Sequence, residues 1–167
     1  MDETPWLDDS QAQMWRAFLD VHRRVEMAIE QQLAGHGLST ADYALLVPLS
    51  ETPDGVMRAR DLGLAAAWDR SRLSHQLRRM TSRGLVSRFT CATDARGTMV
   101  RLEPAGRRAI EAAAPGHVAT VRKHFIDLLQ PGEADTLAAI FTRLREQLPV
   151  DEATLCTGPA QKAHASA

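Results

Sequence analysis

The sequence predicts a mainly α fold of the α+β class, built as one domain around a single β-hairpin. At 167 residues the chain has the length of one domain. Apolar residues recur every three or four positions over most of the chain, which is typical of amphipathic helices. Only positions 85–102 are rich in β-favouring residues, and a turn-forming segment divides them into two short runs.

A long helix is expected at the start of the domain, over residues 10–34. Ser10 can cap it, and apolar side chains recur at helical spacing from Met14 to Leu33. Gly35 follows the last of them, and glycine commonly ends a helix.

A second helix is expected to begin after Ser39, with Asp42 as its capping-box partner three residues on. Pro48 should kink or shorten this helix because proline has no backbone N–H to donate. The turn-forming TPDG stretch then leads to Val56 and Met57, which are expected to form a very short strand.

Two short helices and a hairpin come next. The first helix is expected over residues 58–64, and the second lies between its cap, Asp69, and a stop at Gly84. The hairpin strands are expected at 85–90 and 97–102, joined by a loop longer than two residues. This order is that of a winged helix-turn-helix, whose second helix enters the major groove of DNA.

Two more helices are expected after the hairpin. The first runs from Pro104 to about Leu129, with an interruption at the helix-breaking pair Pro115–Gly116. The second follows Pro131, and its apolar residues up to Leu148 share one face.

Positive charge is concentrated in one part of the chain. The formal net charge of the whole is −1, yet positions 58–101 hold ten arginines and three acidic residues. That segment therefore carries +7 and the remainder −8. Such asymmetry points to nucleic acid as a partner. A solvated basic face with no DNA partner is the alternative.

The second short helix has one apolar and one basic face. Leu73, Leu77 and Met80 form the apolar stripe, and small, polar and basic residues lie opposite. DNA carries a phosphate charge about every 1.7 Å, so a helix that enters a groove needs a basic or neutral face. We expect base reading from the first half of the helix and phosphate contacts from the second. The candidates here and on the next strand are Arg70, Ser71, Arg72, Ser74, His75, Arg78, Arg79, Arg83 and Arg88.

The loop of the hairpin adds two candidates, Asp94 and Arg96. An arginine on a projecting wing can insert into a narrow minor groove, where the negative potential is strongest. A neighbouring carboxylate can hold its guanidinium through paired hydrogen bonds. The alternative is a turn in which aspartate and glycine only suit the backbone.

Between positions 62 and 106 the chain carries a distinctive set of residues: Leu73, Ser74, Arg79, Gly84-Leu85-Val86, Arg88, Asp94-x-Arg96-Gly97, Leu102 and Gly106. Together they resemble the MarR (multiple antibiotic resistance regulator) family of bacterial transcription factors. The order of helices is similar from about Ser10 to Leu148. Two departures are Glu103, where the family often has threonine, and the Pro115–Gly116 pair, which suggests a bent dimerisation helix.

The resemblance implies a homodimer that binds a pseudo-palindromic operator in double-stranded DNA, usually as a repressor released by a small ligand. It implies that Arg96 enters the minor groove and that Asp94 orients it. It also implies that base edges or nearby phosphates are contacted by Ser71, Arg72, Ser74 and His75.

The domain is expected to span residues 10–148, with flexible ends at 1–9 and 149–167. Within it we expect a winged core at about 39–102, flanked by dimerisation helices at about 10–34 and 104–148. The apolar stripes at both ends need a surface to cover them, and a homodimer supplies one. A monomeric helical cap is the alternative. The expected interface residues are Phe18, Val21, Phe125, Leu137, Phe141 and Leu144.

An effector pocket lined by Trp15, His22 and Tyr43 is a further hypothesis, since the family usually binds effectors between the dimer helices and the DNA-binding lobe. No metal or other cofactor is expected, because the histidines lack tight ligand spacing. Cys91 and Cys156 are expected to be ordinary thiols.

The sequence favours no enzyme, because it has no phosphate-cradling glycine loop and no nucleophile motif. Neither a signal peptide nor a long apolar run is recognisable, so a cytoplasmic protein without membrane contact is expected. The alternative function is a protein-interaction module that uses the basic face to bind an acidic partner.

Overall fold

The computed structural model describes residues 5–91 and 94–148. These residues form a mainly helical fold with a winged helix-turn-helix, as the sequence predicts. The elements in chain order are α1 (Asp9–Ala34), α2 (Thr40–Glu51), β1 (Val56–Arg58), α3 (Ala59–Ala65), α4 (Arg70–Ser82), β2 (Val86–Cys91), β3 (Asp94–Leu102), α5 (Pro104–His124), the 3-10 helix η1 (Ile126–Leu128) and α6 (Glu133–Gln147).

The sheet has three antiparallel strands in the order β1-β3-β2. The hairpin register pairs Val86 with Leu102, and an irregularity follows Thr90 near the tip. The expected short strand after α2 is confirmed, and its Val56 pairs with Arg101 of the central strand. β1 thereby ties the end of α2 to the wing.

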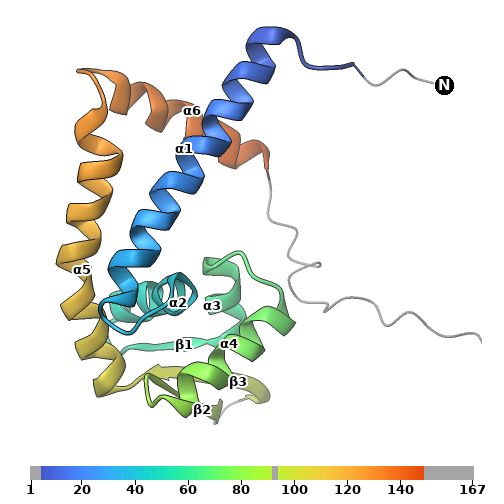
Figure 1. Cartoon of the computed structure of the whole chain (residues 1–167). Helices are drawn as coiled ribbons and strands as arrows, with labels where there is room; N and C mark the ends of the chain where they lie inside the picture. Colours follow the sequence, from blue (N-terminus) through green and yellow to red (C-terminus); the bar gives the residue numbers. More distant parts are fainter. Residues whose placement is uncertain (1–4, 92–93, 149–167) are drawn as a thin grey trace, which may run out of the picture.

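The core lies in the lobe formed by α2, α3, α4 and the sheet. Leu45, Leu46, Leu62 and Val100 are completely buried there. Figure 1 shows α1 and α5 as two long helices that rise from this lobe, with α6 near their far end. No helix among the described residues is long and apolar enough to cross a membrane.

The helix caps follow local sequence signals with one correction. Ser39 and Asp42 form the expected capping box, and the Asp69 carboxylate accepts a hydrogen bond from the backbone N–H of Arg72. The cap of α1 is Asp8 and not Ser10. Asp8 takes this position because its carboxylate accepts from the backbone N–H of Gln11, whose side chain in turn accepts from the backbone N–H of Asp8.

The expected interruption at Pro115–Gly116 is wrong, while the kink expected at Pro48 stays a prediction. α2 continues through Pro48 to Glu51, and α5 continues through Pro115 and Gly116. Each proline removes one hydrogen bond, but both helices are held by buried neighbours on the core side. α5 instead ends at His124, ahead of the expected position near residue 129, and η1 follows. The expected flexible tail, 149–167, and residues 1–4 lie outside the described residues.

Candidate nucleic-acid interface

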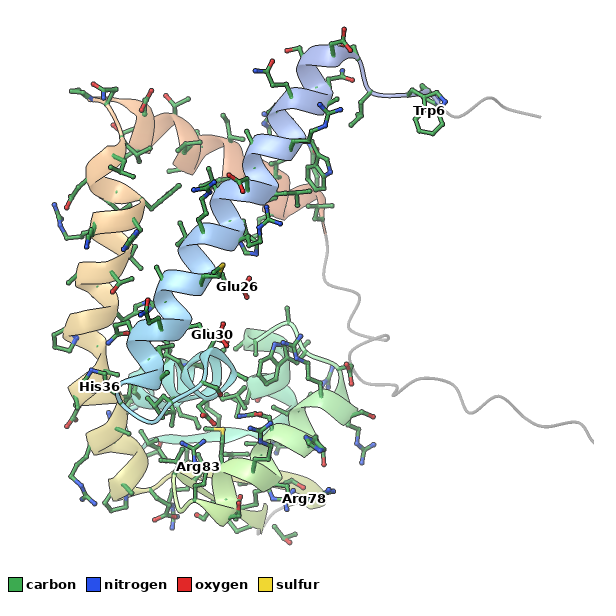
Figure 2. All side chains as sticks on the ribbon, viewed as in Figure 1. Trp6, Glu26, Glu30, His36, Arg78 and Arg83 are labelled. Carbon is green, nitrogen blue, oxygen red and sulfur yellow. The ribbon has the colours of Figure 1, made fainter. Side chains whose placement is uncertain are left out.

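The helix α4 lies on the side of the lobe away from the free end of α1 (Figure 1). Its inner face is the predicted stripe, and Leu73, Leu77 and Met80 are all buried. Its outer face is basic. Arg78 projects at the opposite end of the molecule from Trp6 (Figure 2). Ser74 is half-buried, and the exposed candidates are Arg70, Ser71, Arg72, His75, Arg78 and Arg79.

The buried carboxylate of Asp42 anchors α4 to α2. Asp42 is 1% exposed, and its Oδ1 accepts a hydrogen bond of 2.7 Å from Nε2 of the buried Gln76 in the middle of α4. Its Oδ2 accepts hydrogen bonds from the backbone N–H and the hydroxyl of Ser39, each 2.9 Å long. The cap of α2 is therefore also a cross-link to α4.

Arg83 completes this network, and the phosphate contact expected for it stays a prediction. Its Nη1 donates to Oδ2 of Asp42 at 2.7 Å, and its Nη2 donates to the carbonyl of Gly37 between α1 and α2. Residue type and charge alone do not reveal such an internal partner. The structure assigns Arg83 to holding the end of α4 against α2.

The hydrogen bonds also set the charge state of Asp42. Burial by itself would raise the pKa of this carboxyl, but the hydrogen bonds from Ser39 and the Arg83 guanidinium outweigh it and lower the pKa below its usual value. Asp42 is therefore ionised at neutral pH, and a buried carboxylate in this state needs every one of its partners.

The start of α4 rests on Trp68. The indole is 7% exposed, and the guanidinium carbon of Arg72 lies 4.2 Å from the centroid of the ring. Trp68 is a packing residue, as tryptophan in such a turn usually is, but its contact with Arg72 is not foreseeable from the sequence. The contact depends on a turn whose Ala67 has φ +53°, a conformation that residue type does not predict.

The wing is the β2–β3 hairpin. Arg88 is exposed on β2, and the guanidinium carbon of Arg101 lies 4.9 Å from the centroid of the Phe89 ring. The expected hairpin bounds need a correction: β3 begins at Asp94 and not at Gly97, so Asp94 and Arg96 belong to the strand and not to the loop. Their side chains are outside the described part of the structure. Their expected roles in the minor groove stay predictions.

No family model matches the chain. The solved structure of AbsC, a MarR family transcriptional regulator from Streptomyces coelicolor, is similar with a TM-score of 0.83 and 40% sequence identity. The match covers 86% of this chain and 97% of that chain. The chain belongs to the MarR family of transcriptional regulators.

Two further proteins are similar to this MarR family member. Sco3205, a MarR family transcriptional regulator from Streptomyces coelicolor solved in complex with DNA, has 34% identity and a TM-score of 0.85 over 93% of this chain and 98% of that chain. The HTH-type transcriptional repressor YetL of Bacillus subtilis (strain 168) is 22% identical over 141 residues, which are 83% of this chain and 84% of that protein.

The three effector candidates of this MarR family member divide into two groups. Trp15 and His22 both lie on α1 and stack on either side of Phe18, with ring centroids 5.5 and 6.1 Å apart. Tyr43 of α2 instead contacts His117 of α5, at 4.5 Å between ring centroids. The contacts of Tyr43 therefore lie at a different junction, where α2 meets α5.

The junction at Tyr43 is polar and partly buried. Burial raises the pKa of Tyr43 and lowers the pKa of His117. Nearby, Nε2 of Gln32 donates to the carbonyl of Ala113 at 3.2 Å. Among the described residues, Oε1 of Gln32 and Nδ1 of His117 are buried without a hydrogen-bond partner.

The described residues contain no group of three or more histidine, cysteine, aspartate or glutamate side chains that could hold a metal ion. The side chains of Cys91 and Cys156 lie outside the described part of the chain.

Proposed function

We propose that this MarR family member is a homodimeric repressor that places α4 of each protomer in the major groove of a pseudo-palindromic DNA site. The observation that carries the proposal is the outer face of α4. Five exposed cationic or potentially cationic side chains line it, Arg70, Arg72, His75, Arg78 and Arg79, and no acidic residue lies in the first turn. Sco3205, solved with DNA, and the repressor YetL support it as relatives.

The buried hydrogen bonds that hold α4 also support a role for this helix in contacting DNA bases. A helix that reads bases must hold a fixed orientation relative to the rest of the domain, since base contacts require correct hydrogen-bond geometry. Asp42 fixes the middle of α4 through Gln76 and its end through Arg83. A basic face that served only as an electrostatic patch would need no such buried network.

The dimer part of the proposal rests on unburied apolar side chains. α1 has 26 residues, of which the structure buries Leu33 alone, and of the fifteen residues of α6 none is buried in this single chain. Phe18 and Phe141, on these two helices, are 43% and 45% exposed. Large exposed apolar surfaces mark interaction sites. A second copy of the chain would cover both helices.

The ligand-responsive part of the proposal is located at the junction of Tyr43, Gln32 and His117. Two buried polar atoms without a protein partner can accept or donate hydrogen bonds to a small polar effector. This assignment keeps Tyr43 from the predicted set and replaces Trp15 and His22 by Gln32 and His117. The proposal includes no catalytic step, and it assigns the protein to the cytoplasm, where its DNA would be.

Selection of duplexes from a random library by the purified protein tests the proposal. We expect recovery of an inverted repeat whose half-sites lie about one helical turn apart. A variant with Arg78→Gln and Arg79→Gln should bind the recovered site more weakly, with a salt slope reduced by about 0.9 for each phosphate that is no longer neutralised. Lys123→Gln, at an exposed position near the end of α5, is the control and should change neither quantity. Failure to enrich any duplex would overturn the proposal.

A further inference from the structure

The contact between Trp68 and Arg72 joins a buried residue to an exposed one. Trp68 lies in the turn before α4 and is 7% exposed, whereas Arg72 is exposed on the outer face of that helix. The guanidinium carbon lies 4.2 Å from the centroid of the indole ring. The side chain of Arg72, on the basic face, is thus in contact with a buried side chain of the core.

The indole is a fixed platform. The backbone N–H of Trp68 donates to the carbonyl of Gly63 in α3 at 2.9 Å, and Ala67 before it takes a left-handed conformation with φ +53°. A Cβ atom at Gly63 would lie 3.2 Å from Cδ2 of Leu73, so α3 and the start of α4 are closely packed. A residue in a turn of this kind has little freedom to move relative to α4.

Stacking on a ring leaves the useful atoms of an arginine available. The guanidinium is planar, and its five N–H donors point outward in that plane. A guanidinium whose carbon lies over a ring is restricted by that contact and can keep its N–H donors for paired hydrogen bonds. Restriction before binding lowers the entropy lost when the complex forms.

The position of Arg72 in the helix determines what it can reach. It is the third residue of α4, and the N-terminal residues of a recognition helix are those that contact base edges. The commonest specific contact of an arginine is the bidentate one to O6 and N7 of guanine. The other arginine of the first turn, Arg70, has no ring contact within the described residues.

We propose that Trp68 is a positioning residue that presents the guanidinium of Arg72 to a guanine in each half-site. Arg72 is then a determinant of base specificity, and Trp68 acts through it without touching DNA. This inference rests on the proposed function, because it requires that α4 enters the major groove.

The first test replaces Arg72 by lysine, which keeps the charge and removes the planar fork. Fluorescence anisotropy would measure binding to the selected duplex and to duplexes with each base pair of the half-site replaced in turn. Wild type should discriminate against replacement of one guanine by between about 5-fold and about 150-fold. Arg72→Lys should lose that discrimination at this one position and keep its affinity for scrambled DNA. Arg78→Lys, also on α4, is the matched control and should keep the discrimination.

The second test asks whether Trp68 acts through Arg72. Trp68→Phe keeps an aromatic face and should retain most of the discrimination, while Trp68→Leu should lose much of it at the same base pair. In the Arg72→Lys background, Trp68→Leu should cause no further decrease at that position. A residue needed only for packing would weaken binding to all duplexes equally, and would do so in both backgrounds. Thermal unfolding identifies a Trp68→Leu protein that does not fold. In that case the small loss caused by Trp68→Phe should fall at the base pair read by Arg72 and should vanish in the Arg72→Lys background, and a loss spread over other base pairs would overturn the inference.

The outcomes separate the inference from the function on which it rests. If wild type selects no duplex, both are wrong. If wild type selects an inverted repeat but Arg72→Lys retains every base preference, the inference alone is overturned. It is also overturned if Trp68→Leu changes preferences elsewhere in the half-site and not at the position read by Arg72.

Discussion

The two ends of the molecule differ in how they use their apolar side chains. In the winged lobe Leu45, Leu46 and Leu62 are completely buried within one chain. At the other end, α1 and α6 carry stripes of the same kind, but Phe18 and Phe141 are each more than two-fifths exposed. Both regions have amphipathic helices, so periodicity alone does not tell them apart. The lobe buries its apolar side chains within one chain, and the exposed side chains of α1 and α6 support the proposed homodimer.

The largest effect is expected when charge is placed on the exposed apolar surface of α1 and α6. A variant with Phe18→Glu and Phe141→Glu should dissociate the dimer, because interface anchors contribute about 2 kcal/mol or more each, and two of them correspond to roughly a 1000-fold increase in Kd. Sedimentation equilibrium would measure it, and circular dichroism should show a folded lobe. Phe89→Glu, at a comparably exposed aromatic on the wing, is the control and should leave the dimer intact. A dimer that survives the double substitution would contradict the assignment.

Within the lobe, the largest effect is expected at Asp42. Asp42→Ala removes the acceptor for Gln76 and Arg83 together, and the free energy of unfolding should fall by about 3 kcal/mol, as for other broken buried ion pairs. Urea unfolding measures the change. Asp20→Ala, whose carboxylate pairs with two arginines on the exposed surface of α1, should have little effect because water screens that interaction. If the free energy of unfolding fell equally in the two variants, the buried network at Asp42 would contribute no more than a surface ion pair.

The pH dependence of this anchor has a defined sign. Because the pKa of Asp42 is lowered in the folded protein, its stabilisation is complete at neutral pH and is lost only as the pH falls below about 4. The Asp42→Ala variant should therefore approach wild type in stability at strongly acid pH.

Gly106 offers a smaller perturbation of the same lobe. A Cβ atom at this position would lie 2.2 Å from the carbonyl oxygen of Leu85, so α5 can cross the start of the hairpin only because residue 106 has no side chain. Gly106→Ala should lower the free energy of unfolding by about 1–3 kcal/mol, as other overpacked substitutions do. Gly35→Ala is the comparison variant and should lower the stability less, since its Cβ would make one tight contact of 3.3 Å with the carbonyl oxygen of Gln32. Unchanged stability in Gly106→Ala would contradict the close packing.

The smallest change in stability is expected at His117 of α5, which contacts Tyr43 of α2. Burial lowers the pKa of His117, so the unfolded chain binds a proton there more readily than the folded protein. Stability should therefore decrease as the pH falls below about 6.5, and His117→Phe should reduce that decrease. Chemical unfolding between pH values of about 7.5 and about 5.5 measures the slope. An unaltered slope in His117→Phe would refute the assignment.

Much of the fold could be predicted because its signals are local. Helical spacing, the capping box at Ser39 and Asp42, and the stop at Gly84 need no knowledge of distant residues, and all three are confirmed. The rule that proline interrupts a helix failed where burial of neighbouring side chains stabilised the helix. α5 runs through Pro115 because buried neighbours, Ile110 and Ala113 among them, hold the helix.

The candidate site was less predictable because its partners are distant in sequence. The basic face of α4 follows from its composition, but the link from Asp42 to Gln76 joins residues 34 positions apart. Arg78 and Arg83 are the same residue type, within α4 and at its C-terminal cap, and only the fold shows that Arg83 pairs with the buried Asp42. The stack of Arg72 on Trp68 depends on an alanine with positive φ, which sequence statistics disfavour.

The measurement that tests the central claim most directly is fluorescence anisotropy with wild-type protein across a range of salt concentrations. It would compare the duplex recovered by selection with a scrambled duplex of the same length and composition. If α4 reads DNA, the recovered site should bind about 10³-fold or more tightly than the scrambled one, and both affinities should fall with salt. Equal affinities for the two duplexes would contradict base reading by α4 and would favour an acidic protein as the partner of the basic face.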